Sequence, residues 1–192
     1  QKRRKVESQP RLKLYYFDIK GKGEPIRLMA AYAGLELEDF RISDRSQFTK
    51  MKENGELPFG QLPLLEVCLD DGTKHALPQS AAILRYVSKL AGLYPADDWI
   101  AAAKVDAALD QETDAFIGPT VVSYTTRFGI VFDDATKKAS IELIQKETMP
   151  RHLGAIESLL ENSSTGWIAD TAEPSPADFV WGCRLGDYIP SR

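Results

Sequence analysis

The sequence contains few of the residues that most often build metal centres and disulfide frameworks. Its 192 residues include two cysteines and two histidines. Cys68 and Cys183 lie far apart and form no C-x-x-C pair, and His75 and His152 have no partners at metal-ligand spacing. We therefore expect two reduced, buried thiols and no bound metal.

Long apolar runs and a strong excess of one charge are missing as well. No stretch approaches the roughly 18 apolar residues that a membrane-spanning helix needs, and the N-terminus has no apolar signal-peptide region. The formal net charge of −4 gives no reason to expect nucleic acid or an anionic membrane as a partner. These absences favour a cytoplasmic protein that binds neither.

The composition that is present is that of an ordinary globular protein. Hydrophobic residues make up 43% of the chain and charged residues 27%, so the chain can build a sizeable core. The length suits one large domain or two small ones. The opening QKRRKVESQP is basic and polar, and we interpret it as a solvated tail or linker in preference to a nuclear-import patch.

The first half of the chain alternates between strand-like and helix-like periodicity. Pro25 and Gly34 suit the start and the end of a helix, and the turn signal Asp71-Gly72 joins two strands into a hairpin. The predicted order is β-α-β-α-β-β-α. Strands are expected at 12–19, 38–42, 62–69 and 74–78, a loop and helix within 21–34, a weak helix or ordered loop at 46–56, and a helix at 80–90.

The second half shows helical periodicity only, beyond a boundary near residues 91–97. Asp97 or Asp98 can cap its first helix. A second helical stretch runs from about 135 to 160 and is interrupted or restarted at Pro150. The apolar positions expected to recur on the core face of the first helix are Ile100, Val105, Leu109 and Phe116.

A third helix is predicted to begin at the stretch SPADFVWG. Ser175 can cap the backbone, and Asp178 occupies the reciprocal position of a capping box, with Asp in place of the commoner Glu. We expect this box to have a structural role.

Two short motifs of the first half have both a structural and a functional interpretation. Pro63 opens a strand and is a candidate for a cis bond that would leave the Leu62 backbone available to an extended peptide, although the residues alone favour a trans edge-strand proline. Gln79 and Ser80 stand where a helix begins and could bind a carboxylate there. For Ser80 alone, an N-cap is the favoured interpretation.

Two further residues have the same ambiguity. Tyr16, with Tyr15, ends the first strand, and a tyrosine hydroxyl there could donate a hydrogen bond to a thiolate. Asp114 lies on the first helix of the second half, from which a carboxylate could meet an ammonium group. Taken singly, a packed tyrosine and a solvated aspartate are favoured.

The combination of these motifs is more informative than any one of them. LYYFDIKGKGEPIRL, LPFGQLPLLEV, LPQSAAILRYVSKLAGLYP and VDAALDQETDAF resemble stretches of the cytosolic glutathione transferases, and within them the sigma-like class, over about residues 12–190. The resemblance implies an α/β thioredoxin-like domain at 12–92 and an all-α helical domain at 97–192. Residues 1–11 are then an N-terminal extension, and the helical domain looks truncated at its C-terminal end.

The resemblance also implies an activity and a set of site residues. The enzyme would activate the thiol of glutathione, its co-substrate, for attack on small hydrophobic electrophiles or hydroperoxides, in detoxification. By this resemblance Tyr16 is the tyrosine that stabilises the thiolate, because it is followed by Phe17 and a residue of the Asp/Asn type. The glutathione-binding residues implied are Tyr16, Phe48, Lys52, Gln61, Leu62, Pro63 (cis in relatives), Gln79 and Ser80, with Asp114 reaching the glutathione of the neighbouring subunit in a homodimer.

Departures from the family pattern leave alternatives open. Lys22, which the resemblance places at the electrophile pocket, stands where relatives that form prostaglandin D carry arginine, and the insertion at 53–56 makes the match of Lys52 less direct. The alternatives are a prostaglandin-type isomerase and a non-catalytic structural or ligand-binding relative. A thiol-disulfide reductase is disfavoured, because Tyr16 stands where that chemistry needs cysteine.

Overall fold

The computed structural model describes residues 9–186 of the chain. The chain divides into two compact units, one ending at Gly92 and the other beginning at Leu93. Of the expected N-terminal extension, residues 1–8 lie outside the described residues, and the first strand already begins at Arg11. The first unit mixes strands and helices, and the second is helical in its described part.

The first unit is built on a four-stranded mixed sheet with the strand order β2-β1-β3-β4. β1 pairs in parallel with β2, and β3 pairs antiparallel with both β1 and β4. The predicted β-α-β-α-β-β-α order is confirmed. The elements are β1 (Arg11–Phe17), α1 (Glu24–Tyr32), β2 (Leu37–Ile42), α2 (Arg45–Glu53), β3 (Leu64–Cys68), β4 (Lys74–Pro78) and α3 (Ser80–Ala91).

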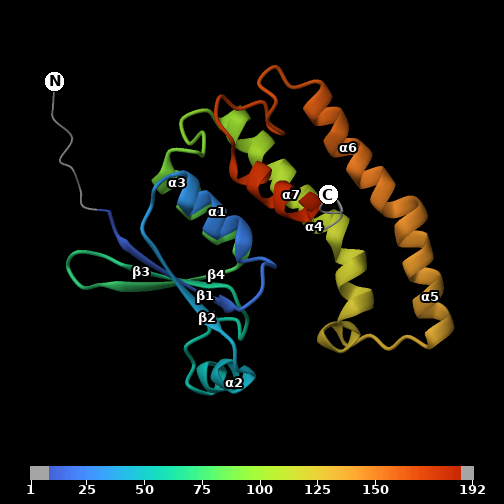
Figure 1. Ribbon diagram of the computed structural model, residues 1–192, viewed down its shortest axis with the longest axis horizontal. Coiled ribbons are helices and arrows are strands. Elements are labelled where there is room, and N and C mark those ends of the chain that lie inside the picture. Colours follow the sequence, from blue (N-terminus) through green and yellow to red (C-terminus); the bar gives the residue numbers. More distant parts are fainter. Residues whose placement is uncertain (1–8, 187–192) are drawn as a thin grey trace. The chain divides into compact units, whose positions relative to one another are not determined.

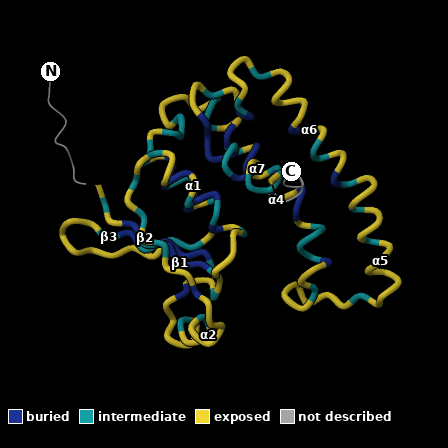
Figure 2. Tube along the Cα trace, viewed as in Figure 1, coloured by how far each residue is buried: buried dark blue, intermediate teal, exposed yellow. Residues whose placement is uncertain are grey.

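Helices cover both faces of this sheet. α1 and α3 lie side by side on one face, and α2 lies on the other (Figure 1). Alternate residues of β1, namely Leu12, Leu14 and Tyr16, are buried, as the two-residue period of a strand requires. Buried positions follow α1 and the middle of the sheet, whereas the tip of the β3–β4 hairpin is exposed (Figure 2). Other buried apolar residues of this core are Ile26, Met29, Leu65, Val67, Ile83 and Val87.

Every regular element in the described part of the second unit is helical. α4 begins after Asp98, whose carboxylate accepts hydrogen bonds from the N–H groups of Ile100 and Ala101. Asp98 is therefore the cap, not Asp97. The elements are α4 (Trp99–Ser123), the 3-10 helix η1 (Thr125–Phe128), α5 (Asp134–Leu143), the π-helix η2 (Ile144–Thr148), α6 (Met149–Glu161) and α7 (Pro176–Gly186).

The predicted restart near Pro150 is also present. α5, η2 and α6 follow one another without a gap, and the π-helical turn ends immediately before α6, which carries Pro150 in its first turn. Proline has no N–H to donate to the preceding turn, and here that turn is π-helical instead of α-helical.

Two expectations about burial were wrong. Val105, Leu109 and Phe116 are buried, but Ile100 is 71% exposed, because five residues separate it from Val105 and this places it about 140° around the helix. The two thiols are reduced as expected, but Cys68 and Cys183 are partly exposed instead of buried.

Asp178 organises the start of α7. Its carboxylate accepts hydrogen bonds from the backbone N–H of Ser175 and from the Ser175 hydroxyl, both at 2.8 Å. Its other oxygen accepts from the N–H of Ile168, which ties the preceding loop to the helix. Asp178 thus fills its expected place in a capping box. The Ser175 hydroxyl, which a standard box directs at a backbone N–H, here donates to the carboxylate.

Replacing Ser175 with alanine is expected to lower stability more than activity. The substitution removes one donor from a fully buried position and costs about 0.5–2 kcal/mol of unfolding free energy. Thermal unfolding together with specific activity on the same sample measures both effects. A variant that keeps its melting temperature but loses turnover would contradict a purely structural role.

Candidate functional site

Tyr16 is enclosed by the loop that follows β1. Its ring is 7% exposed, and the backbone N–H of Lys22 donates a hydrogen bond to its hydroxyl oxygen at 3.0 Å. A Cβ added at Gly21 would lie 2.7 Å from that oxygen, and one at Gly23 would lie 2.6 Å from the ring. The loop can therefore approach the phenol this closely only because both positions are glycine.

Tyr15 has different surroundings, since successive residues of a strand point to opposite faces. Its ring packs against Phe40 at a centroid distance of 5.2 Å, and Lys13 lies over it at 5.2 Å. Burial, partly offset by the charge of Lys13, raises the pKa of the Tyr15 hydroxyl above its usual value. Of the two tyrosines, Tyr16 is thus the one whose hydroxyl meets the glycine-containing loop.

The start of α3 departs from the expectation for a simple capped helix. Ser80 is the first helical residue, not the N-cap; Gln79 occupies the N-cap position and its side chain makes no capping hydrogen bond. Gln79 has φ 73° and ψ 116°, a conformation that costs a residue with a side chain about 1–3 kcal/mol. The first intrahelical bond runs from Ile83 N–H to Gln79 C=O. The preceding N–H groups have no partner within the helix, which is the arrangement that binds a carboxylate.

The peptide bond between Leu62 and Pro63 is cis. The trans bond that the residues alone favoured was therefore wrong, and the form implied by the family resemblance is the one present. Leu62 lies outside the β3 ladder, whose first residue Leu64 pairs with Pro78. Pro63 itself is buried next to this strand.

One small hollow of the first unit collects most of the predicted residues. Its volume is about 40 Å³. Phe59 and Pro78 had not been predicted; Phe59 is an exposed aromatic side chain in a loop, and no local pattern distinguishes it from a surface residue. The full lining is Lys22, Phe59, Gln61, Leu62, Pro63, Pro78, Gln79 and Ser80.

Phe48 and Lys52, both on α2, are not among these lining residues. The ammonium group of Lys52 is 4.7 Å from the centroid of the Phe48 ring, and Phe48 packs edge-on against Phe17. The Lys52 side chain passes 3.8 Å from the position that a Cβ on Gly60 would take. The inserted residues 53–56 therefore do not remove Lys52 from the neighbourhood of Gln61.

Arg27 was missed as part of this region. Its Nε donates to Asp39 at 2.9 Å, and its Nη1 donates to Glu24 at 3.0 Å and to the carbonyl of Ile19 at 3.1 Å. Burial alone would raise the pKa of Asp39, but hydrogen bonds from Arg27 and Arg41 outweigh it and hold that pKa below its usual value. The spacing of Glu24 and Arg27, three residues apart on a helix, was the available sequence signal.

Comparison with known proteins places these features in a family. The sequence pattern described as "Glutathione S-transferase, N-terminal domain" matches residues 12–89. "Glutathione S-transferase" from Anopheles gambiae is 32% identical over 94% of this chain and 80% of its own length. "Glutathione S-transferase 1" from Ascaris suum is 36% identical over 83% of this chain and 71% of its own length. The chain belongs to the glutathione S-transferase family.

A solved relative supports the same assignment at the level of the fold. The structure of prostaglandin synthase D of Nilaparvata lugens superposes with a TM-score of 0.75 at 32% identity, covering 93% of this chain and 82% of that one. The expected fold class is confirmed: a thioredoxin-like α/β part is followed by a helical part, as in glutathione transferases. The protein is a glutathione transferase enzyme.

Relatives with different class designations match this chain equally well. "Glutathione S-transferase S1" from Drosophila melanogaster and "Glutathione S-transferase alpha-3" from Rattus norvegicus are both 30% identical to this transferase. The matched regions span 54% and 64% of those two proteins.

The remaining predicted residue, Asp114, is exposed on α4 in the second unit of the transferase. The structure contains one chain, so its expected contact with a neighbouring subunit stays a prediction. Residues 9–186 include no cluster of three His, Cys, Asp or Glu side chains able to hold a metal ion. Nor does any helix in this range have the length and apolar character needed to cross a membrane.

Proposed function

We propose that this transferase conjugates the thiolate of glutathione to small hydrophobic electrophiles, and that it also reduces organic hydroperoxides. The observation that carries the proposal is the single hollow that joins the Tyr16 loop, the Leu62-Pro63 segment and the start of α3. These three segments come from separate parts of the sequence, and each offers what a different part of the tripeptide needs.

The anchoring end of the site is the start of α3. The γ-glutamyl carboxylate accepts hydrogen bonds from the Ser80 hydroxyl and the first N–H groups of the helix, with Gln79 donating to the same group. The Leu62 backbone pairs with the cysteinyl residue as an added strand would. Gln61 and Lys52 bind the glycyl carboxylate, and Phe48 supports Lys52 by packing against its ammonium group.

The reacting end is Tyr16. Its hydroxyl donates a hydrogen bond to the glutathione sulfur and stabilises the thiolate, which is the nucleophile. The Tyr16 oxygen accepts a hydrogen bond from the Lys22 N–H. The hydroxyl proton of Tyr16 is therefore left to point at the sulfur. Lys22 lies at the entrance for the electrophile, which is held close to the sulfur so that two substrates react within one site.

We further propose a sigma-like class, a cytoplasmic homodimer and a role in detoxification. The similarity to the insect prostaglandin synthase D favours an isomerase activity as the second candidate. Lys22, which cannot form the bidentate contacts of arginine, counts against that candidate. In the homodimer, Asp114 reaches the glutathione amine in the partner subunit.

The proposal is tested by glutathione-affinity capture followed by a conjugation assay with 1-chloro-2,4-dinitrobenzene. We expect the protein to be retained, to be eluted by free glutathione and to form the conjugate. Retention without turnover for any of a panel of acceptors, including a hydroperoxide and a prostaglandin endoperoxide, would instead identify a non-catalytic binding protein. Absence of retention would reject the glutathione site itself.

Ser80→Ala is expected to weaken glutathione binding about tenfold, since one hydrogen bond to a charged group is worth roughly 1.5 kcal/mol. The Michaelis constant for glutathione rises accordingly, while turnover at saturating glutathione falls much less. Ser140→Ala, the same change on the half-buried Ser140 of α5 in the second unit, serves as the control and leaves the constant unchanged. Equal effects of the two changes would contradict the assignment of Ser80.

A further inference from the structure

We propose that Arg27 is a positioning residue for Tyr16: it holds the loop after β1 against the phenol, and so directs the Lys22 N–H at the phenol oxygen. The proposal rests on the proposed function only for its kinetic consequence. Arg27 lies on α1 and is not one of the residues that line the hollow.

The side chain of Arg27 links three segments around the loop. One arm of the guanidinium holds Asp39 on β2, and another holds both the Ile19 carbonyl after β1 and Glu24 in the first turn of α1. These two anchored positions, Ile19 and Glu24, are the ends of the segment that contains Lys22. Fixing the ends of a short loop restricts the conformations of the residues between them.

Close packing makes the loop sensitive to this anchor. The guanidinium carbon lies 5.9 Å from the centre of the Tyr16 ring. A Cβ on Gly23 would contact both sides, at 2.6 Å from the Tyr16 ring and 3.2 Å from Nη1 of Arg27. The loop backbone therefore passes between the guanidinium and the phenol with no space left over.

Arg27 is unusual because its charged side chain is almost completely buried. Its side chain is only 10% exposed, and among the described residues Nη2 is the one buried side-chain nitrogen or oxygen without a hydrogen-bond partner. An unpaired buried donor is costly, so a residue placed only for stability would be better replaced by an apolar one. The cost is tolerated if the guanidinium is needed to hold Asp39, the Ile19 carbonyl and Glu24 together, because its rigid, planar fork fixes the directions of its hydrogen bonds.

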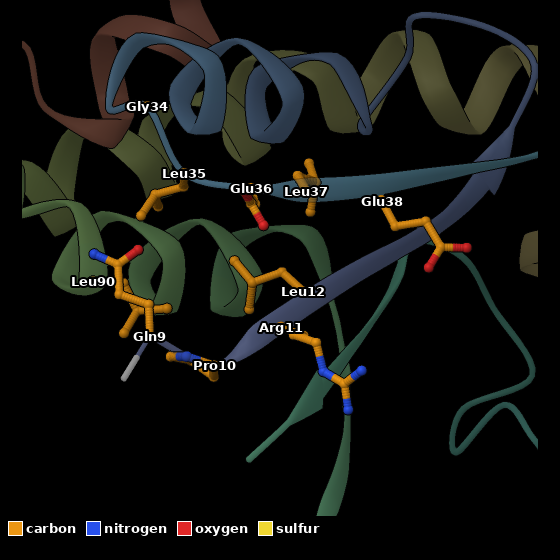
Figure 3. A pocket seen from close by; sticks show the side chains of 10 residues that line it. All are labelled: Gln9, Pro10, Arg11, Leu12, Gly34, Leu35, Glu36, Leu37, Glu38 and Leu90. Atoms are coloured by element: carbon orange, nitrogen blue, oxygen red, sulfur yellow. The ribbon is translucent and has the colours of Figure 1, made fainter. Parts of the chain in front are cut away.

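The test compares Arg27→Lys, Arg27→Leu and Glu38→Gln. Glu38→Gln is the control: it removes an ion pair of the same sheet that does not involve the loop, between Lys13 on β1 and Glu38 on β2, which are 2.6 Å apart. Glu38 lines a separate hollow of about 700 Å³, formed by the start of β1 with the residues before it, by the start of β2 with the residues before it, and by Leu90 of α3 (Figure 3). Each variant is examined by amide hydrogen exchange, by denaturant unfolding and by steady-state kinetics with glutathione and 1-chloro-2,4-dinitrobenzene.

In Arg27→Lys we expect exchange of the 20–24 amides to rise about tenfold while exchange in β1 and β3 stays within about twofold. Turnover falls about tenfold and the Michaelis constant for glutathione changes little, because the anchoring groups at α3 are untouched. Arg27→Leu shows a larger effect of the same pattern, and Glu38→Gln shows none. If Arg27→Leu fails to fold, Arg27→Lys still decides.

Unchanged loop exchange and unchanged turnover in Arg27→Lys would overturn the proposal. It would also be overturned if exchange rose equally throughout the first unit in step with lost stability, because Arg27 would then be only structural. Should the wild-type protein lack transferase activity, the proposed function fails, and the exchange measurement still shows whether Arg27 holds the loop.

Discussion

Tyr16→Phe is expected to lower kcat/KM for conjugation about 100-fold while leaving glutathione affinity within about twofold. The substitution keeps the ring, which is almost fully buried, and removes only the hydroxyl that accepts from Lys22 N–H. The same hydroxyl is the proposed donor to the glutathione sulfur. Without it, the bound thiol ionises only at a higher pH, near the value of about 8.5 for an unperturbed cysteine. The measurement is the pH dependence of kcat/KM, whose acidic limb should move upward by one to two units.

Tyr15→Phe is the matched control, because Tyr15 is the neighbouring residue of the same strand and packs against Phe40 instead. We expect its pH profile to superpose on that of the wild type. If the two variants behaved alike, or if Tyr16→Phe kept full activity, thiolate stabilisation would have to come from another group. The first turn of the loop, with the Lys22 N–H, would then be the next candidate.

Residues with restricted backbones explain why the order of elements could be predicted. Gly92 ends α3 in the left-handed conformation, with φ 71°, and Gly34 follows α1 with φ 65°. Asp71 accepts from the N–H of Thr73 in the turn between β3 and β4, and Gly72 in that turn has φ 84°. These signals are local, so they can be read from a few consecutive letters.

The features of the site that were mispredicted depend on contacts between distant segments. A serine at a helix start is usually a cap, and nothing nearby in the sequence shows that Gln79 takes φ 73° and displaces the cap by one position. The cis bond at Pro63 is equally invisible, because trans is the commoner form of any X-Pro bond. Arg27 gains its role from Asp39, twelve residues away, and from the packing of Tyr16.

The family resemblance recovered part of what local signals missed. It supplied the cis form of Pro63, it chose Tyr16 over Tyr15 as the predicted catalytic residue, and it favoured carboxylate binding over simple capping at Gln79 and Ser80. It contributed nothing on Phe59 or Pro78, which complete the lining of the hollow. Residues that only line a cavity, or that position a neighbouring residue as Arg27 does, are not recognisable from a catalytic or binding motif.

The second unit contains a largely buried ion pair, and breaking it is expected to have the other large effect, on stability. Glu112 on α4 is 6% exposed and accepts a hydrogen bond from Nε of Arg184 on α7 at 2.6 Å. The guanidinium also lies over the ring of Phe116, 4.5 Å from its centre. One turn earlier, the indole N–H of Trp181 donates to the carbonyl of Ala108. These contacts join the two helices through a nearly inaccessible carboxylate and indole and a guanidinium whose side chain is 23% exposed.

Arg184→Leu is expected to lower the free energy of unfolding by about 3–5 kcal/mol, because it leaves the Glu112 carboxylate buried without its cation. Denaturant unfolding measures this loss. The double variant Glu112→Leu/Arg184→Leu is expected to regain most of it, since two apolar side chains need no hydrogen-bond partners and can pack against Phe116. Lys146→Leu, which breaks the exposed pair with Glu142, is the control and should leave stability nearly unchanged. If Arg184→Leu were as mild as this control, water must reach Glu112, and the ion pair would contribute little to the contact between α4 and α7.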